Sequence, residues 1–301
     1  MDLSVVCPFY NEAGEIENAA RKLLGQLAAL DVSAELILVD DGSTDDSGEI
    51  VQRLAKEWPQ LRLLRYPENR GRGYALRTGM AAAQGRIIVT TEMDLSWGET
   101  IVEDLFRSLE ESPEKDIVIA SPHLSGGGYK NVPRHRVWLS RLGNRIIRLL
   151  MPGAATMNTG MTRGYRREAI ASLPFEEDRK VFHIEVILKA SHFGLRIAEI
   201  PAVLTWKVPQ GRGARQKTGD LLRVISSHAQ FALAAGAARI FWVLGGLWLV
   251  LSAAAREFAV AAAVFFLLGT AAHVRGRAQR RRWAAQRAEL LRQWQQSAPS
   301  E

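Results

Sequence analysis

The sequence predicts an α/β protein with a mostly parallel sheet and helices on both faces, followed by an apolar helical hairpin and a basic tail. From Leu3 to Ala120, short runs of Val, Ile and Leu alternate with longer stretches of helical spacing. Residues 229–274 carry very few charges, and the residues after them are rich in arginine. Strands that alternate with helices form parallel sheets that are covered on both faces.

The expected elements follow one another in a regular order. Each strand is a short apolar run, and each helix between two strands provides the crossover that places them side by side in parallel. Polar loops follow the carboxyl ends of the strands, where α/β proteins bind ligands. In chain order the elements are strand Leu3–Cys7, helix Glu15–Leu30, strand Leu36–Val39, helix Asp45–Glu57, strand Leu61–Arg65, helix Gly73–Ala83, strand Arg86–Thr90, helix Ile101–Glu110 and strand Asp116–Ala120.

Composition limits the setting of the chain. Its 301 residues, 47% of them hydrophobic, suit one α/β domain of roughly 200 to 250 residues with an appendage. The single cysteine, Cys7, cannot form an internal disulfide, and no signal peptide precedes the first strand, so we expect a cytoplasmic N-terminal domain. Of the net charge of +7, Arg275–Glu301 contributes +5, from seven arginines and two glutamates. This charge adjoins an apolar region and no nucleic-acid-binding module is recognised, which favours anionic lipid over nucleic acid as partner.

A long basic region follows the last expected strand. No acidic residue occurs between Ile117 and Arg167, so this surface should attract anions. Apolar residues recur at helical spacing between its arginines, which predicts an amphipathic helix at about 134–151. Such a helix lies either against a membrane or against its own sheet with a solvated basic face. The nine bases are Lys130, Arg134, Arg136, Arg141, Arg145, Arg148, Arg163, Arg166 and Arg167.

The apolar region predicts two transmembrane helices within residues 229–274. Residues 229–255 contain one charge, at Arg239, and Phe258–Val274 is uncharged apart from His273. As a helix, the 17 residues of the second stretch extend roughly 26 Å, at the short end of what crosses a bilayer core. The alternatives are a soluble hairpin buried in a homo-oligomer, and interfacial helices.

The bases that flank this hairpin predict its orientation in a cell membrane. They place the domain, residues 1–228, and the tail, residues 275–301, together on the cytoplasmic side. The tail carries Trp283 and Leu290 among its arginines and is expected to be an interfacial helix. A coiled-coil stub is the alternative.

The loops after the first two strands offer groups that suit a nucleoside. Tyr10 provides a flat surface for a base, while Glu12 and Asp41 provide acceptors for base N–H groups and ribose hydroxyls. Both loops fall at the ligand edge of the predicted sheet. For Asp45, in the second loop, the expected role is a helix N-cap.

Two further loops supply groups for a diphosphate and a metal ion. Gly71 and Gly73 precede a helix, whose first N–H groups suit diphosphate oxygens. Glu92 and Asp94 leave the strand that begins at Arg86, one residue apart. With diphosphate oxygens, such a pair can hold Mg²⁺ or Mn²⁺ and offset the charge on a departing nucleoside diphosphate.

In combination, these motifs resemble family 2 glycosyltransferases of the GT-A fold, and within them the dolichyl- and polyprenyl-phosphate sugar synthases. The resemblance covers roughly residues 1–217. Its four main motifs are Pro8–Glu12, Val39–Asp45, Asn69–Ala75 and Glu92–Ser96, and later matches are Asn158–Gly160, Tyr165–Glu168, Ile184–Val186 and Glu199–Pro201.

The resemblance implies which residues bind the donor. Those expected to contact the nucleoside are Pro8, Tyr10, Glu12 and Asp41. Glu92, Asp94 and Ser96 are expected to surround the metal ion and the diphosphate.

The resemblance also implies an acceptor site. Arg136, Ser140 and Asn144 are spaced by four, so one helix face presents all three, and Arg136 is expected to meet the acceptor phosphate. The residues expected to cap phosphates from a loop are Lys207, Arg212 or Arg215.

The sequence departs from the family pattern at four places. Glu92 stands where the family usually has Asp, and Trp97-Gly98 stands where it has His-Pro. Pro122 replaces an arginine and so removes one expected phosphate ligand. Met157–Met161 replaces Asp-Pro-Thr-Ser-Gly, which is compatible with another donor sugar or acceptor.

The function that the resemblance implies is inverting transfer of a sugar from GDP-mannose or a UDP-hexose to a polyprenyl or dolichyl phosphate. Such a phosphate is anionic near neutral pH, so catalysis needs positioning and charge neutralisation more than a base. One alternative is a sugar hydroxyl acceptor with Glu185 as the base. The other is a non-catalytic scaffold tethered to a membrane.

Overall fold

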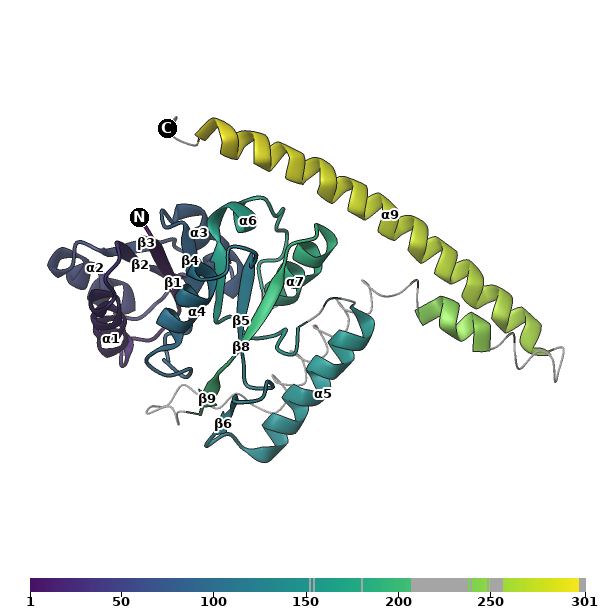
Figure 1. Ribbon diagram of the computed structural model, residues 1–301, viewed down its shortest axis with the longest axis horizontal. Helices are drawn as coiled ribbons and strands as arrows, with labels where there is room; N and C mark the ends of the chain where they lie inside the picture. Colours follow the sequence, from purple (N-terminus) through teal and green to yellow (C-terminus); the bar gives the residue numbers. More distant parts are fainter. Residues whose placement is uncertain are drawn as a thin grey trace.

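Figure 1 shows the computed structural model, in which helices cover a central sheet and a long helix, α9 (Glu257–Ser297), crosses one side of the domain. The structure describes residues 1–206 except 152, 154 and 180, and then residues 238, 240–247, 249 and 257–297. The predicted α/β class with a mostly parallel sheet is confirmed.

Within the described residues, seven strands form the main sheet in the order β3-β2-β1-β4-β7-β5-β8. All pairs are parallel except those of β7, which runs antiparallel to both of its neighbours. A small parallel sheet of β6 and β9 lies beside it. The strands are β1 (Leu3–Phe9), β2 (Ala34–Asp40), β3 (Leu61–Arg65), β4 (Ile87–Thr90), β5 (Ile117–Ser121), β6 (Gly128–Lys130), β7 (Arg163–Arg166), β8 (Ile197–Pro201) and β9 (Val203–Thr205).

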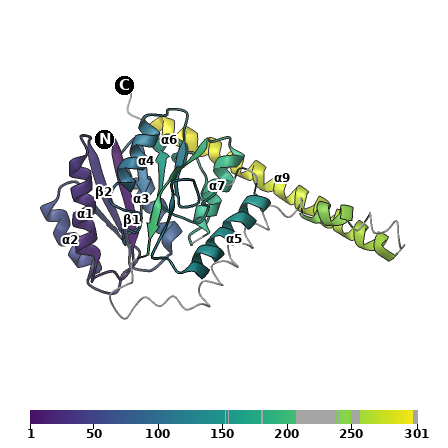
Figure 2. The same ribbon diagram turned by 60° about the horizontal axis from the view of Figure 1, so that its bottom comes forward.

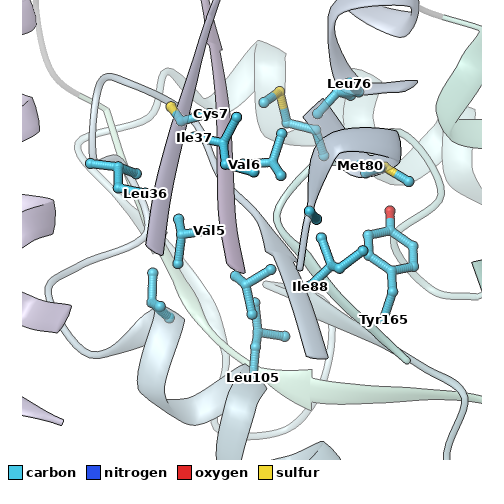
Figure 3. Close-up of a cluster of buried hydrophobic side chains, with 14 of the residues drawn as sticks. Val5, Val6, Cys7, Leu36, Ile37, Leu76, Met80, Ile88, Leu105 and Tyr165 are labelled. Carbon is cyan, nitrogen blue, oxygen red and sulfur yellow. The ribbon is translucent and has the colours of Figure 1, made fainter. Parts of the chain in front are cut away.

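The central strands are buried on both faces, as the near-continuous apolar runs predict. Val5 and Val6 point to opposite faces of β1 because side chains alternate along a strand, and both are fully buried. Figure 3 shows them among Leu36, Ile37 and Leu76. Helices therefore cover both sides of the sheet (Figure 2), and the polar loops are left at its edges.

The helices in the first part of the chain begin and end within two residues of their predicted positions. Helix α4 shows why the spacing of apolar residues was enough to predict these helices, since its buried residues recur every three or four positions. The helices are α1 (Ile16–Ala29), α2 (Ser47–Glu57), α3 (Arg72–Ala82), α4 (Ile101–Glu110), α5 (Arg134–Leu150), α6 (Arg167–Ala171), α7 (Phe182–His192) and α9.

Helix α5 confirms the predicted helix at about 134–151. One side holds it to the domain through Asn144 and Ile147, which are 3% exposed. The other side leaves Trp138 61% and Leu149 82% exposed. The helix therefore packs on its own domain and also presents a second apolar face, so the two expected placements do not exclude each other.

The basic region is less exposed than its composition predicts. Arg163 is fully buried and donates to the carbonyl oxygens of Asn158 (2.7 Å) and His183 (2.8 Å). Arg166 donates to three main-chain carbonyls, among them that of Lys115 at 2.7 Å. The expectation that all nine bases attract anions is therefore wrong for these two, because buried carbonyl groups take up their donors.

The apolar region is described in part. Residues 240–247 lie beside the first part of α9, where Trp242 packs on Gly269 and Phe266 packs on Gly245. Most of residues 229–255 lie outside the described residues. Among the residues that are described, no helix is both long and apolar enough to cross a membrane. The transmembrane hairpin stays a prediction.

The tail is helical, as expected, and its placement at a membrane interface stays a prediction. It continues the preceding helix without a break, because a glycine at 276 lowers helix propensity without blocking the helix as proline would. Trp283 donates to Glu176 (3.4 Å) and lies 4.9 Å from the Lys189 ammonium. The Arg287 guanidinium stacks on Phe193 at 4.5 Å. This part of α9 therefore docks on the domain through polar and aromatic contacts.

Candidate active site

The loops after β1 and β2 are joined at one edge of the sheet. The Asn11 N–H donates to Ser43 Oγ (3.0 Å), and the Thr44 N–H donates to Asn11 Oδ1 (2.8 Å). The Ala13 N–H donates to Asp45 Oδ2 (3.1 Å). Because the strands are parallel, their carboxyl ends meet here, as predicted. Asp45 also accepts the Ser47 N–H at the start of α2 (3.1 Å), which is close to its predicted capping role.

Two of the residues expected to contact a nucleoside differ in exposure. Tyr10 is 44% exposed, so its ring is available to a base. Pro8 is part of β1, where it pairs with Val39, and it is half-buried. Its predicted contact with a nucleoside stays a prediction.

Asp41 is turned into the protein. Its carboxylate is buried and accepts the Tyr66 hydroxyl (2.7 Å), the Arg70 N–H (2.9 Å) and the Gly71 N–H (3.1 Å). In this structure it fastens the loop between β3 and α3, and its predicted contact with a nucleoside stays a prediction.

The predicted diphosphate role of Gly71 and Gly73 stays a prediction, and the structure gives these glycines a packing role. The N–H of Gly71 is bound by Asp41, and the N–H of Tyr74 donates to the Asp178 carbonyl (3.0 Å). A Cβ would lie 2.7 Å from the Asp178 oxygen at Gly71 and 2.8 Å from the Arg179 oxygen at Gly73. Glycine is needed at both positions because segment 177–179 packs directly on the start of α3.

Glu92 and Asp94 leave β4 at the same edge. Glu92 Oε2 accepts the Trp97 indole N–H (3.2 Å) and the Ser96 hydroxyl (3.4 Å), while its Oε1 lies 3.5 Å from Arg72 Nη1. Asp94 is exposed, and its Oδ1 accepts the Ser96 N–H (2.9 Å). The structure therefore brings the three predicted metal-site residues, Glu92, Asp94 and Ser96, into one turn.

The site is rich in negative charge. Burial raises the pKa of Glu92, an effect that Arg72 counters and Asp94 increases. Loss of solvent contact raises the pKa of Glu12, and the charges of Glu15 and Asp94 add to this rise. Carboxylates that repel one another in this way are stabilised by a cation.

Glu92 and Asp94 are the residues that could hold a divalent ion here. Their oxygens are the ligands that Mg²⁺ and Mn²⁺ prefer, and Mg²⁺ commonly takes only one or two carboxylates beside substrate phosphates. In the described part of the chain, no group of three or more His, Cys, Asp or Glu side chains forms a metal cage.

The expected acceptor face of α5 is turned partly toward the domain. Arg136 is half-buried and stacks on Trp206 at 4.5 Å. Ser140 is bonded to Tyr129 (3.1 Å), and Asn144 Oδ1 accepts the Asn158 N–H (2.7 Å). Ser140 and Asn144 therefore help to hold the helix to the domain, and the predicted contact of Arg136 with the acceptor phosphate stays a prediction. Lys207, Arg212 and Arg215 lie outside the described residues.

Comparison with known proteins identifies the family. The sequence signature of glycosyl transferase family 2 matches residues 4–173, more than half of the chain. The chain belongs to this family. Glycosyltransferase AglD of Haloferax volcanii is 30% identical over 226 residues, which cover 74% of this chain and 35% of that protein. Dolichol-phosphate mannosyltransferase of Pyrococcus furiosus is 24% identical, with 67% of this chain and 56% of that protein covered. The chain thus spans about a third to just over half of these two relatives.

The fold of this family 2 transferase matches a solved structure. Glucosyl-3-phosphoglycerate synthase from Mycobacterium tuberculosis, determined with Mn²⁺, UDP and glucosyl-3-phosphoglycerate, is 22% identical with a TM-score of 0.59. The match covers 77% of this chain and 79% of that one. The predicted GT-A fold is confirmed.

A cavity of about 890 Å³ lies away from these loops, between α9 and helices α3 and α6 of the transferase. Its lining includes Arg77, Met80, Ile170 and Leu290 and none of the predicted site residues. Figure 1 shows α9 on the side of the sheet where β1 begins, whereas β6, β9 and α5 gather on the opposite side.

Sequence reasoning missed three contacts at the site. Arg72 lies within the Asn69–Ala75 motif but had no predicted role, and its guanidinium lies 3.5 Å from Glu92. Trp97 was seen as a departure from the family, and this was the signal for its contact with Glu92. Nothing in the spacing indicated that Trp206 supports Arg136, since that contact joins distant parts of the chain.

Glu185, the candidate base for a hydroxyl acceptor, is a structural residue here. It is 2% exposed and pairs with the fully buried Lys189 at 2.6 Å. Its oxygens also accept the N–H groups of Glu176 (2.9 Å) and Glu177 (3.0 Å). A carboxylate held by these donors is not free to accept a proton from a substrate.

We therefore expect Glu185→Gln to lower the free energy of unfolding of the domain. Removing one partner of a buried ion pair costs roughly 3 to 5 kcal/mol, because the other charge is left uncompensated. Denaturant unfolding measures this loss, and Glu168→Gln, on the exposed side of α6, serves as the control. A variant with normal stability and no transfer activity would contradict the structural role. It would instead support Glu185 as the catalytic base for a hydroxyl acceptor.

Proposed function

We propose that this transferase moves a sugar from a nucleotide-sugar donor, GDP-mannose or a UDP-hexose, to a polyprenyl phosphate, with inversion at the anomeric carbon. The observation that carries the proposal is the Glu92–Asp94 pair at the edge where the loops of Tyr10 and Asp41 meet, on the side of the sheet that also bears the arginine-rich helix α5.

The donor side would bind a nucleoside diphosphate through base stacking and charge. Tyr10 is exposed for a base, and Glu12 follows it in the same loop. Mg²⁺ or Mn²⁺ held by Glu92 and Asp94 would neutralise the charge that develops on the leaving diphosphate. The Mn²⁺ and UDP in the similar solved structure support this choice of ligands.

The acceptor side favours an anion. Arg136 sits at the start of α5, and Arg141, Arg145 and Arg148 are exposed further along it. A phosphate oxygen can attack the anomeric carbon without a base, because it is already ionised near neutral pH. Since Glu185 is committed to Lys189, this arrangement supports a phosphate acceptor over a hydroxyl acceptor. The name of the Pyrococcus furiosus relative supports a lipid carrier for that phosphate.

Membrane attachment forms part of the proposal. The first part of α9 exposes Val260 (71%) and Leu267 (70%), and the neighbouring described helix exposes Val243 (71%). Apolar side chains that are exposed together over a large area need lipid or protein to cover them. We propose that residues 229–274 anchor the transferase in the cell membrane as a two-helix hairpin, with the domain and both termini in the cytoplasm.

Transfer of radiolabelled sugar tests the reaction. Full-length protein in detergent is given a panel of UDP- and GDP-sugars with undecaprenyl or dolichyl phosphate, with and without Mn²⁺. We expect a metal-dependent lipid product, and a loss of at least about 100-fold in Asp94→Asn, because a bound metal ion contributes several kcal/mol of charge stabilisation. Asp31→Asn, at an exposed position, is the matched control. Near-normal transfer by Asp94→Asn would remove the metal assignment, and nucleotide binding without any lipid product would point to a hydroxyl acceptor.

Alkaline extraction of cell membranes tests the anchor. An embedded hairpin should keep the protein in the membrane pellet at high pH, where proteins bound only by charge are released. Recovery of the full-length protein in the soluble fraction would contradict the hairpin.

The exposed face of α5 is expected to bring the domain to the lipid surface. Trp138→Glu combined with Leu149→Glu should raise the KM for polyprenyl phosphate in bilayers by about tenfold or more, because burying each apolar side chain in lipid is worth about 1.5 to 3 kcal/mol. Affinity for the nucleotide should stay unchanged. Ala28→Glu with Ala29→Glu adds the same charge on exposed positions of α1 and is the control. An unchanged KM in the α5 variant would place the acceptor elsewhere.

A further inference from the structure

Trp97 folds back onto the acidic loop that contains it. The Asp94 side chain accepts the Ser96 N–H (2.9 Å), Leu95 has a φ of 50°, and Gly98 has a φ of 88°. This tight turn carries Trp97 to a position where it is only 5% exposed and its indole N–H donates to Glu92 Oε2 at 3.2 Å.

The two oxygens of Glu92 face different partners. Oε2 is held by the Trp97 indole and, at 3.4 Å, by the Ser96 hydroxyl. Oε1 points to the opposite side, where Arg72 Nη1 lies 3.5 Å away. One oxygen is therefore fixed by neutral donors, while the other is directed at a positive charge.

The indole is itself held firmly. Trp97 belongs to the buried core together with Met93 and Met157. A Cβ on Gly160 would lie 3.8 Å from its Cζ2 atom, so the chain passes directly beside the ring. The Ser96 carbonyl accepts the Thr205 N–H (2.8 Å), which ties the same turn to β9. The donor to Glu92 is thus a rigid group, unlike a hydroxyl that can rotate.

A rigid hydrogen-bond donor matters at position 92 because the side chain of Glu92 is longer than that of aspartate. Glutamate has one more rotatable bond than aspartate, so ordering its carboxylate at a binding site costs more conformational entropy. A hydrogen bond to one oxygen restricts that freedom before a ligand arrives. Groups that orient metal ligands in this way commonly change metal affinity by 10- to 100-fold.

We propose that Trp97 is a positioning residue for the divalent cation: its indole N–H fixes Oε2 of Glu92 so that Oε1 is directed at an ion that Asp94 also binds. The inference rests on the proposed function, since it assigns a role within the same metal site.

Binding of Mn²⁺ to the full-length protein tests this role without relying on turnover. Titration in the presence of UDP or GDP should give a Kd for Mn²⁺ that rises about tenfold in Trp97→Phe, which keeps an aromatic ring but loses the N–H. The melting temperature without metal should change little. Trp58→Phe, at the half-buried end of α2, is the matched control and should leave the Kd unchanged.

A double-mutant cycle separates positioning from packing. In a Glu92→Asp background the shorter acid no longer reaches the indole, so Trp97→Phe should have little further effect on the Kd. An equal loss in both backgrounds, or an unchanged Kd in Trp97→Phe, would overturn the inference and leave Trp97 as a core residue. If the wild type binds no Mn²⁺, the inference falls with the metal assignment, and sugar transfer measured without metal then decides separately whether the proposed reaction stands.

Discussion

The buried carboxylate of Asp41 is the contact on which the donor side of the molecule depends. A buried carboxylate is costly unless its oxygens are hydrogen-bonded, and here the Tyr66 hydroxyl and the N–H groups of Arg70 and Gly71 fill that need. These bonds fix the loop after β3 in the position from which α3 begins. Arg72, the first residue of α3, then stands opposite Glu92 on the neighbouring loop. Charge balance at the candidate metal site therefore follows from a hydrogen-bonding requirement at the end of β2.

Parallel strands supply the rest of this geometry. Glu92 and Asp94 reach the loop of Glu12 only because β1 and β4 are parallel neighbours whose carboxyl ends lie together. Burial raises the pKa values of Glu12 and Glu92, and the repulsion between the charges gathered in this way adds to the rise. Arg72 compensates in part, and a divalent ion with a diphosphate would complete the balance. Binding of the divalent ion would thus reduce the repulsion between these carboxylates.

Sequence patterns predicted the sheet and the position of the site because both depend on local regularities. Apolar runs identify β1, β2 and β4, and the polar loops after them must share one edge. Contacts between distant segments lay beyond such patterns. Gly71 and Gly73 resemble a phosphate loop, yet the chain at Asp178 occupies the space beside them. Arg163 was counted as a surface base, although the carbonyls of Asn158 and His183 draw it into the interior. β7 went unnoticed because a short antiparallel strand with two arginines lacks the apolar run that marks its neighbours.

The distribution of free charge favours the proposed phosphate acceptor over a hydroxyl acceptor. Attack by a hydroxyl group needs a carboxylate that can take a proton. Glu185 was the candidate for this role, but its oxygens are bound by Lys189 and by two backbone N–H groups. Phosphate attack needs positive charge near the anomeric carbon, and α5 provides exposed arginines next to an apolar face. The same helix that would neutralise the phosphate therefore also has the surface to meet the lipid that carries it. In the proposed reaction, acceptor binding and acceptor delivery would be two properties of one amphipathic helix, which Asn144 holds to the domain.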